Sequence, residues 1–388
     1  VRRAATLPPT PTVFFIVALS IWTLLNSYVF WRLSTLPGIE HRLSVPVFWA
    51  IAVVLWVAYP VARTLSARRI DSIALPLEYV ATFWIGLVFL LFCGFLLLDV
   101  LTVGGLLFST HTGPLRTGIA LAACGLGIVG LVQWLRSPII RTHEIRLHGL
   151  HPTQDGLTLA LVSDLHLGTL LGARWAETVV DRINALDADL VVMVGDLIDG
   201  NVTRVEPMAP ILARVKARLG VYAVAGNHDH YAGLDPSLAL LERAGFQLLQ
   251  SRWVEPVEGL VLAGIDDLTA TGRRKGAAAA AVRNALVGAP PNRPVLLLSH
   301  TPLAPDEVEG TRVDLVLSGH THGGQIWPFG HLVALRHPHV AGLYSSGPTQ
   351  HLVGRGAGTW GPPMRLWTPG EIVRVRLRVA GVTGAGPP

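Results

Sequence analysis

The feature that most constrains the fold of this chain is a short apolar run that ends in two acidic residues. Residues 190–194 are rich in β-branched side chains, and Gly195, Asp196 and, three positions later, Asp199 follow them. Such a run is too short for a helix and predicts a strand that is buried on both faces. Open α/β sheets carry their chemistry at the carboxyl ends of their strands, so Asp196 is expected at a functional edge.

Four other strand-like runs end in similar turns, at residues 159–163, 221–225, 295–298 and 315–317. The acidic, amide and imidazole residues that follow them are Asp164, His166, Asn227, His228, His300, His320 and His322. Stretches with helical spacing separate the strands, at residues 173–186, 205–219, 238–244 and 275–286. Alternating strands and helices predict an α/β domain with a largely parallel or mixed sheet, which would gather these turns at one edge.

The residue types in these turns predict a metal centre. One isolated histidine is more often structural, but clustered carboxylates and imidazoles repel one another unless cations lie between them. Imidazole, carboxylate and amide oxygen together favour Mn²⁺, Fe or Zn²⁺ over Mg²⁺ or Ca²⁺. Seven candidate ligands are too many for one ion with open positions, and they suit two ions, roughly 3.5–4 Å apart, that share a carboxylate.

The N-terminal third has a different character. The whole chain is 51% hydrophobic and only 15% charged, which is unusual for a soluble protein. Four apolar stretches are long enough to cross a bilayer as helices, at about residues 13–31, 45–62, 77–98 and 117–135. Gly125, Gly127 and Gly130 give the fourth stretch a face suited to close helix contact. Asp99 is expected at an interfacial helix end, and no charged pair is expected elsewhere in the spans, which favours an anchor over a transporter.

Arginines in the short loops predict the orientation of the spans. Three lie on one side, namely Arg32, Arg42 and Arg116, and eight lie on the other, namely Arg2, Arg3, Arg63, Arg68, Arg69, Arg136, Arg141 and Arg146. This bias places both termini and the C-terminal domain in the cytoplasm, in a multi-pass protein of the cell membrane. The arginines are too dispersed, and too little interleaved with aromatics, for a nucleic-acid surface. Two cysteines build no disulfide framework.

The chain contains, in order, five motifs that resemble those of the calcineurin-like metallophosphoesterases: Asp164-x-His166, Gly195-Asp196-x-x-Asp199, Gly226-Asn227-His228-Asp229, His300 and Gly319-His320-x-His322. The runs 318–326, 354–356 and 369–372 resemble the branch that contains the bacterial YkuE and YaeI proteins, which has membrane-associated members. The resemblance covers residues 143–378. It implies mixed β-sheets layered with flanking helices over these residues. The composition of the chain itself predicts a transmembrane region (1–136) and a linker (137–142) before this domain and a disordered tail (379–388) after it.

The resemblance also implies the roles of the site residues. One metal ion would be held by Asp164, His166, Asp196 and His322, and a second by Asp196, Asn227, His300 and His320. His228 would protonate the leaving alkoxide or stabilise the phosphoryl oxygens, and Asp199 would orient His228. Gly200 stands where phosphoprotein phosphatases continue with Arg-Gly, so protein phosphatase activity is not expected.

The expected function is therefore a membrane-anchored binuclear phosphoesterase that hydrolyses phosphomonoesters or phosphodiesters with metal-activated hydroxide, with a lipid-linked substrate as one candidate. The alternatives are an inactive phosphoesterase fold kept as a binding scaffold, and a transporter with a regulatory hydrolase domain. Lesser candidates are Asp229 and His230 at the pocket wall and Arg355 and Arg365 as substrate ligands, whereas His331, His337 and His339 are expected in a solvated loop.

Overall fold

The computed structural model describes residues 11–271 and 276–381, so Arg2, Arg3, the predicted helix start at Lys275 and the end of the predicted tail lie outside the described residues. The chain forms two compact units. The first runs to Gln133 and includes Gly361–Leu366, and the second runs from Trp134 to Trp360 and resumes at Trp367. The chain therefore leaves the second unit for six residues near its end and then returns to it.

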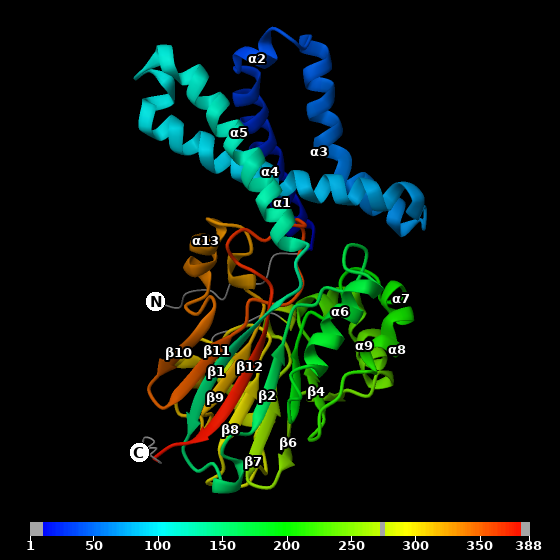
Figure 1. Ribbon diagram of the computed structural model, residues 1–388, viewed down its shortest axis with the longest axis vertical. Coiled ribbons are helices and arrows are strands. Elements are labelled where there is room, and N and C mark those ends of the chain that lie inside the picture. The colour runs from blue at the N-terminus through cyan, green and yellow to red at the C-terminus, as the bar shows by residue number, and fades with distance from the viewer. Residues whose placement is uncertain (1–10, 272–275, 382–388) are drawn as a thin grey trace. The chain divides into compact units, whose positions relative to one another are not determined.

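Four long helices make up most of the first unit (Figure 1): α1 (Pro11–Ser34), α3 (Val45–Ala67), α4 (Asp71–Thr102) and α5 (Ser109–Trp134). The short α2 (Pro37–Glu40) and the 3₁₀ turn η1 (Val103–Gly105) connect them. Each long helix is apolar and long enough to cross a membrane, as the sequence predicts. Each helix extends beyond its predicted span at one end or both, and α5 ends one residue before the predicted end of its span.

Two acidic residues of this unit, Asp99 and Glu78, are paired with arginines, so the expectation that the spans hold no charged pair is wrong. Arg32 contacts Asp99 at 2.6 Å and Arg116 contacts it at 3.6 Å. Tyr28 donates a hydrogen bond to the same carboxylate, and Arg63 contacts Glu78 at 3.2 Å. These residues are far apart in the sequence, so only the packing of the helices reveals the pairs.

The second unit contains two six-stranded mixed sheets, which confirms the expected fold class. The first sheet has the order β1 (Ile139–Leu147), β12 (Glu371–Val379), β2 (Thr158–Val162), β3 (Leu190–Val194), β4 (Val221–Val224) and β5 (Gln247–Leu248). The second has the order β10 (Gly342–Ser346), β11 (Thr349–Val353), β9 (Leu315–Ser318), β8 (Val295–Leu298), β7 (Leu260–Gly264) and β6 (Arg252–Val257). Strands β2 to β5 are parallel, as are β7, β8, β9 and β11.

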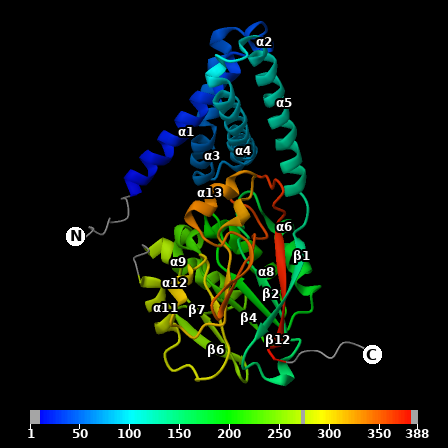
Figure 2. The same ribbon diagram turned by 90° about the vertical axis from the view of Figure 1, so that its left-hand side faces the viewer.

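The two sheets pack face to face, with helices on their outer faces (Figure 2). Strand β3 is apolar on both faces because each of its faces lies in a different hydrophobic core. Leu190, Val192 and Val194 point into the core between the sheets, while Val191 and Met193 pack under α6 (Ala173–Asn184), α8 (Ala209–Leu212) and α9 (Asn227–Arg243). Helices α11 (Ala277–Ala285) and α12 (Pro305–Val308) cover the other sheet.

Two helical predictions differ from the structure. The expected helix over 205–219 is broken into α7 (Val202–Val205), the turn η3 (Glu206–Met208) and α8, because Pro207 and Pro210 lack the N–H that a continuous helix needs. A helix also occupies part of the segment expected to be a solvated loop, namely α13 (Phe329–Arg336).

Candidate metal centre

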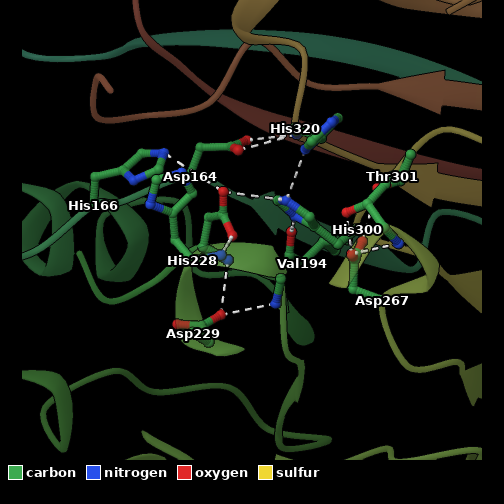
Figure 3. A network of polar contacts seen from close by, with 12 residues as sticks. Asp164, His166, Val194, His228, Asp229, Asp267, His300, Thr301 and His320 are labelled. Carbon is green, nitrogen blue, oxygen red and sulfur yellow. Dashed lines mark hydrogen bonds and ion pairs between the residues drawn. The ribbon is translucent and has the colours of Figure 1, made fainter. Parts of the chain in front are cut away.

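The ends of five strands, three from one sheet and two from the other, bring the predicted site residues together (Figure 3). Asp164 and His166 follow β2, Asp196 follows β3, and Asn227 opens α9 directly after β4. From the other sheet, His300 follows β8, and His320 and His322 follow β9. The sequence places these residues correctly at strand ends, but the site lies between two sheets and not along one.

Besides a group formed by His166, Asp196 and His228, two groups of candidate ligands form at these loops. Asp164, His166 and His322 each present a ligand atom within 4.8 Å of the others, and so do Asp196, His300 and His320. The His166 ring also lies beside Asp196, with Nε2 3.7 Å from Oδ2. One buried carboxylate therefore faces both groups, which is the position that a shared ligand requires.

The hydrogen bonds of His300 define which ring nitrogen faces the site. Its Nδ1 lies 3.0 Å from the carbonyl oxygen of Val194, which can only accept, so Nδ1 carries the proton. Its Nε2 then points to Asp196 Oδ2 at 3.2 Å and to His320 Nδ1 at 3.2 Å. A ring nitrogen aimed at both a carboxylate and a second imidazole needs a proton or a cation at that point.

The electrostatics of the site agree with this need for positive charge. Burial lowers the pKa of His166 to about 4 and that of His320 to about 3, so both rings are neutral and carry a free lone pair at pH 7. Burial also opposes the charged form of His300, but the adjacent Asp196 carboxylate raises its pKa well above the usual range. A divalent cation beside Asp196 would supply the charge that this proton otherwise provides.

An unpaired buried oxygen supports the same conclusion. Among the described residues, the buried Oδ1 of Asn227 has no hydrogen-bond partner. Leaving such a group unpaired costs about 1–3 kcal/mol, and coordination to a metal would remove that cost. The residues present therefore fit a binuclear centre of mixed imidazole, carboxylate and amide ligands.

The backbone around the site is held in an uncommon conformation. Five candidate ligands have positive φ angles, between 46° and 71°; they are Asp164, His166, Asp196, His320 and His322. Each such residue costs on the order of 1–3 kcal/mol, and such costs cluster at functional sites. Glycine allows the loops to approach: a Cβ at Gly226 would lie 2.2 Å from Asp196 Oδ1, and one at Gly195 would lie 2.4 Å from His300 Nδ1.

His228 lies beside these two groups and is only partly buried. Its Nδ1 is 2.9 Å from Asp199 Oδ1, and its backbone N–H donates to Asp196 Oδ1 at 2.8 Å. The rings of Tyr231 and Trp360 flank it, with centroids 5.5 and 5.6 Å away. Burial lowers the pKa of His228, but the hydrogen bond to Asp199 and the charge of Asp196 raise it above its usual value overall.

Two further carboxylates, those of Asp229 and Asp267, form hydrogen bonds that stabilise the loops of the site. Asp229 is buried and accepts from the backbone N–H groups of Asp196, Gly226 and Ile198 at 2.8–3.0 Å. Burial and the nearby Asp196 raise its pKa to about 7. Asp267 accepts a hydrogen bond from Thr301 at 2.7 Å, directly after His300. Asp229 belongs to the motif that begins at Gly226, whereas the only sequence signal for Asp267 is its place after a predicted strand.

Asp229→Asn is expected to destabilise the fold by about 1–3 kcal/mol and to weaken metal binding. The new amide NH₂ group would face backbone donors where a carboxylate oxygen now accepts. Chemical denaturation and metal titration measure the two effects. Exchanging the exposed Asp181 for asparagine is the control, and unchanged stability in Asp229→Asn would contradict this assignment.

The arginines and histidines considered as further site residues lie in different environments in the structure. Arg365 is fully buried and belongs to the first unit, and Arg355 contacts Glu371 at 3.8 Å. His337 lies close to His320, with ring centroids 5.2 Å apart. His339 is buried, so the expectation of a solvated loop is wrong for it.

The comparisons with known proteins agree with this geometry. Residues 157–324 match the family model described as calcineurin-like phosphoesterase. A metallophosphoesterase of Helicobacter pylori (strain J99) is 36% identical over 68% of this chain and 70% of its own length. The metallophosphoesterase YkuE of Bacillus subtilis is 30% identical over 69% of this chain and 94% of its own length.

A bovine relative, named a transmembrane protein with metallophosphoesterase domain, is 34% identical over 71% of this chain. The match spans 65% of that protein's length, slightly less than two thirds. Motif order, site geometry and these relatives together show that the chain belongs to the calcineurin-like metallophosphoesterases, which are metal-dependent phosphoric ester hydrolases.

Proposed function

We propose that the chain is a membrane-anchored phosphoesterase that uses two divalent metal ions to hydrolyse phosphomonoester or phosphodiester bonds. The observation that carries this proposal is the single buried carboxylate of Asp196, which faces both groups of candidate ligands. A complete set of ligand types and the presence of His228 argue against an inactive scaffold.

The proposed ligands form two sets that share Asp196. The first set is Asp164, His166, Asp196 and His322, and the second is Asp196, Asn227, His300 and His320. The donor types suit Mn²⁺, Fe or Zn²⁺. When bound, the ions would lower the pKa of a water molecule and offset the charge that develops on the phosphoryl group.

His228 is proposed to give a proton to the leaving oxygen. Its raised pKa keeps the ring protonated closer to neutral pH, and its Nε2 is free of the Asp199 contact that Nδ1 makes. Asp199 would fix the ring orientation and stabilise the imidazolium, as a positioning residue.

The Asp199→Asn variant tests that role through a pH profile. The carboxylate contact raises the pKa of His228, so its loss should lower that pKa and move the descending limb of the pH–rate profile to lower pH. Metal content should stay at two equivalents. A profile that superposes on the wild type would show that Asp199 does not orient the proton donor.

A lipid-linked substrate is the finer part of the proposal. Arg63, Arg68, Arg69, Arg136 and Arg141 follow or precede predicted spans and suit anionic headgroups. In the described part of the second unit, a cavity of about 330 Å³ reaches His337, whose ring adjoins His320, and is lined by Pro302 and Arg336 among others. It offers space for a leaving group beyond the phosphate.

The purified full chain, loaded with Mn²⁺ and tested on nitrophenyl phosphate mono- and diesters and then on lipid phosphates, tests the proposed activity. We expect metal-dependent hydrolysis of at least one class of ester, and the preferred class would define the substrate. A chain that binds metal and hydrolyses none of them would support the scaffold alternative.

The catalytic unit is proposed to lie in the cytoplasm, on the basis of the eight arginines against three in the short loops. A reporter fused behind β12 should therefore be fluorescent as a fluorescent protein and inactive as an alkaline phosphatase. The opposite pattern would place the phosphoesterase outside the membrane. Fusions within the loop 41–43, which should lie on the other side, provide the control.

A further inference from the structure

An exposed apolar surface lies beside the metal centre. We call it the apolar rim, and it consists of Trp327, Phe329, Leu332, Leu335 and Trp367. All five side chains are exposed, and Leu335 is 84% exposed. Helix α13 contributes three of them and has no buried residue, so its apolar side chains add nothing to the core. Large exposed apolar patches of this kind mark contact surfaces.

Sequence neighbours and hydrogen bonds link the apolar rim to the site. Its first residue, Trp327, comes soon after the His320-x-His322 motif, and His337, the residue after α13, adjoins the His320 ring. Gln325 donates to the Trp360 carbonyl at 3.0 Å and accepts from the Trp360 N–H at 3.1 Å. Trp360 in turn flanks His228. The rings of Trp327 and Trp367 are 5.3 Å apart.

The path of the chain connects the apolar rim to the apolar helices. Between Trp360 and Trp367 the chain belongs to the first unit. There, Met364 fills the space over two glycines: a Cβ at Gly86 would lie 2.7 Å from its Sδ, and one at Gly130 would lie 3.4 Å from its Cβ. Residue 365 donates its N–H to the Gly130 carbonyl at 3.0 Å. Trp367 is therefore covalently adjacent to a segment that is packed among the candidate membrane helices.

We propose that the apolar rim inserts into the lipid interface of the bilayer that holds those helices; this rests on the membrane anchoring proposed above. Tryptophan prefers the headgroup level, and leucine and phenylalanine extend below it. Arg336, at the end of α13, suits anionic headgroups. The site then receives phosphates at headgroup depth, so its substrates are phosphate esters of lipids.

A fluorescent label tests the insertion without measuring activity. In the full chain with Cys93→Ala and Cys124→Ala, Leu335→Cys is labelled with an environment-sensitive dye and placed in nanodiscs of phosphatidylcholine and phosphatidylglycerol. Val287→Cys is the matched control, since Val287 is also an apolar residue of the second unit, 73% exposed and outside the apolar rim. Nitroxide-labelled lipid is then added as a quencher.

We expect a blue-shifted emission at position 335 with at least several-fold stronger quenching than at position 287. Adding Leu332→Glu should reduce that quenching, while hydrolysis of soluble nitrophenyl esters stays at the wild-type rate. Equal quenching at both positions would overturn the proposal, and so would a blue shift at 335 without quenching, because it would show a protein partner in place of lipid. Quenching at 335 in a chain that hydrolyses no ester would refute the proposed activity and leave the insertion intact.

Discussion

Replacing Asp196 with asparagine is expected to abolish ester hydrolysis and to lower the bound metal to one equivalent or less per chain. The carboxylate is buried and adjoins His166 and His300 at 3.7 and 3.2 Å. The amide keeps the shape but removes the charge that both proposed ions share, and it introduces an NH₂ group among ring nitrogens. Elemental analysis of the loaded protein and hydrolysis of nitrophenyl esters measure the two effects.

The control for this variant is Asp181→Asn, an exposed carboxylate paired with Arg214 on the surface. It should bind two equivalents of metal and hydrolyse esters at the wild-type rate. Full metal content together with full activity in Asp196→Asn would refute the shared-ligand assignment.

The second large effect is expected at His228. His228→Ala should keep both metal equivalents and lose on the order of 10²-fold or more in turnover, the usual range for a positioned proton donor. The ring contacts Asp199 through Nδ1 and lies beside the two ligand groups. The exposed His148 supplies a matched His→Ala control.

Loss of metal in His228→Ala would show that this histidine is a ligand. The structure makes that a real test, because His166, Asp196 and His228 also present ligand atoms within 4.8 Å of one another. Esters with better leaving groups should lose less activity in the variant, since their departing oxygen needs a proton less.

The sequence predicts those parts of the fold in which each residue's environment follows from its own segment. Strand β3 is recognisable because both of its faces are buried, which requires an unbroken apolar run. The edge strands β6 and β10 are half-exposed and carry no such run, so the sequence does not indicate them. The sequence does not indicate helix α13 either. This helix has no buried face, and a buried face is what produces a helical period in the apolar residues.

The candidate ligands could be predicted because each one ends an apolar strand in a motif of fixed spacing. The contacts that Asp229 and Asp99 make could not be predicted, because their partners come mostly from other segments. Asp229 acts through three backbone N–H groups of other residues, and Asp99 through two arginines on other helices. Every residue except proline has a backbone N–H, so a sequence does not indicate which of them donates to a carboxylate. Which charged side chains form ion pairs between helices depends on how the helices pack.

The most direct test of the central claim is the position of metal in crystals of the full chain loaded with Mn²⁺, located by anomalous scattering. We predict two peaks, one among Asp164, His166 and His322 and one among Asn227, His300 and His320, with Asp196 between them. A single peak, or none, in protein that hydrolyses phosphate esters at full rate would contradict the binuclear centre.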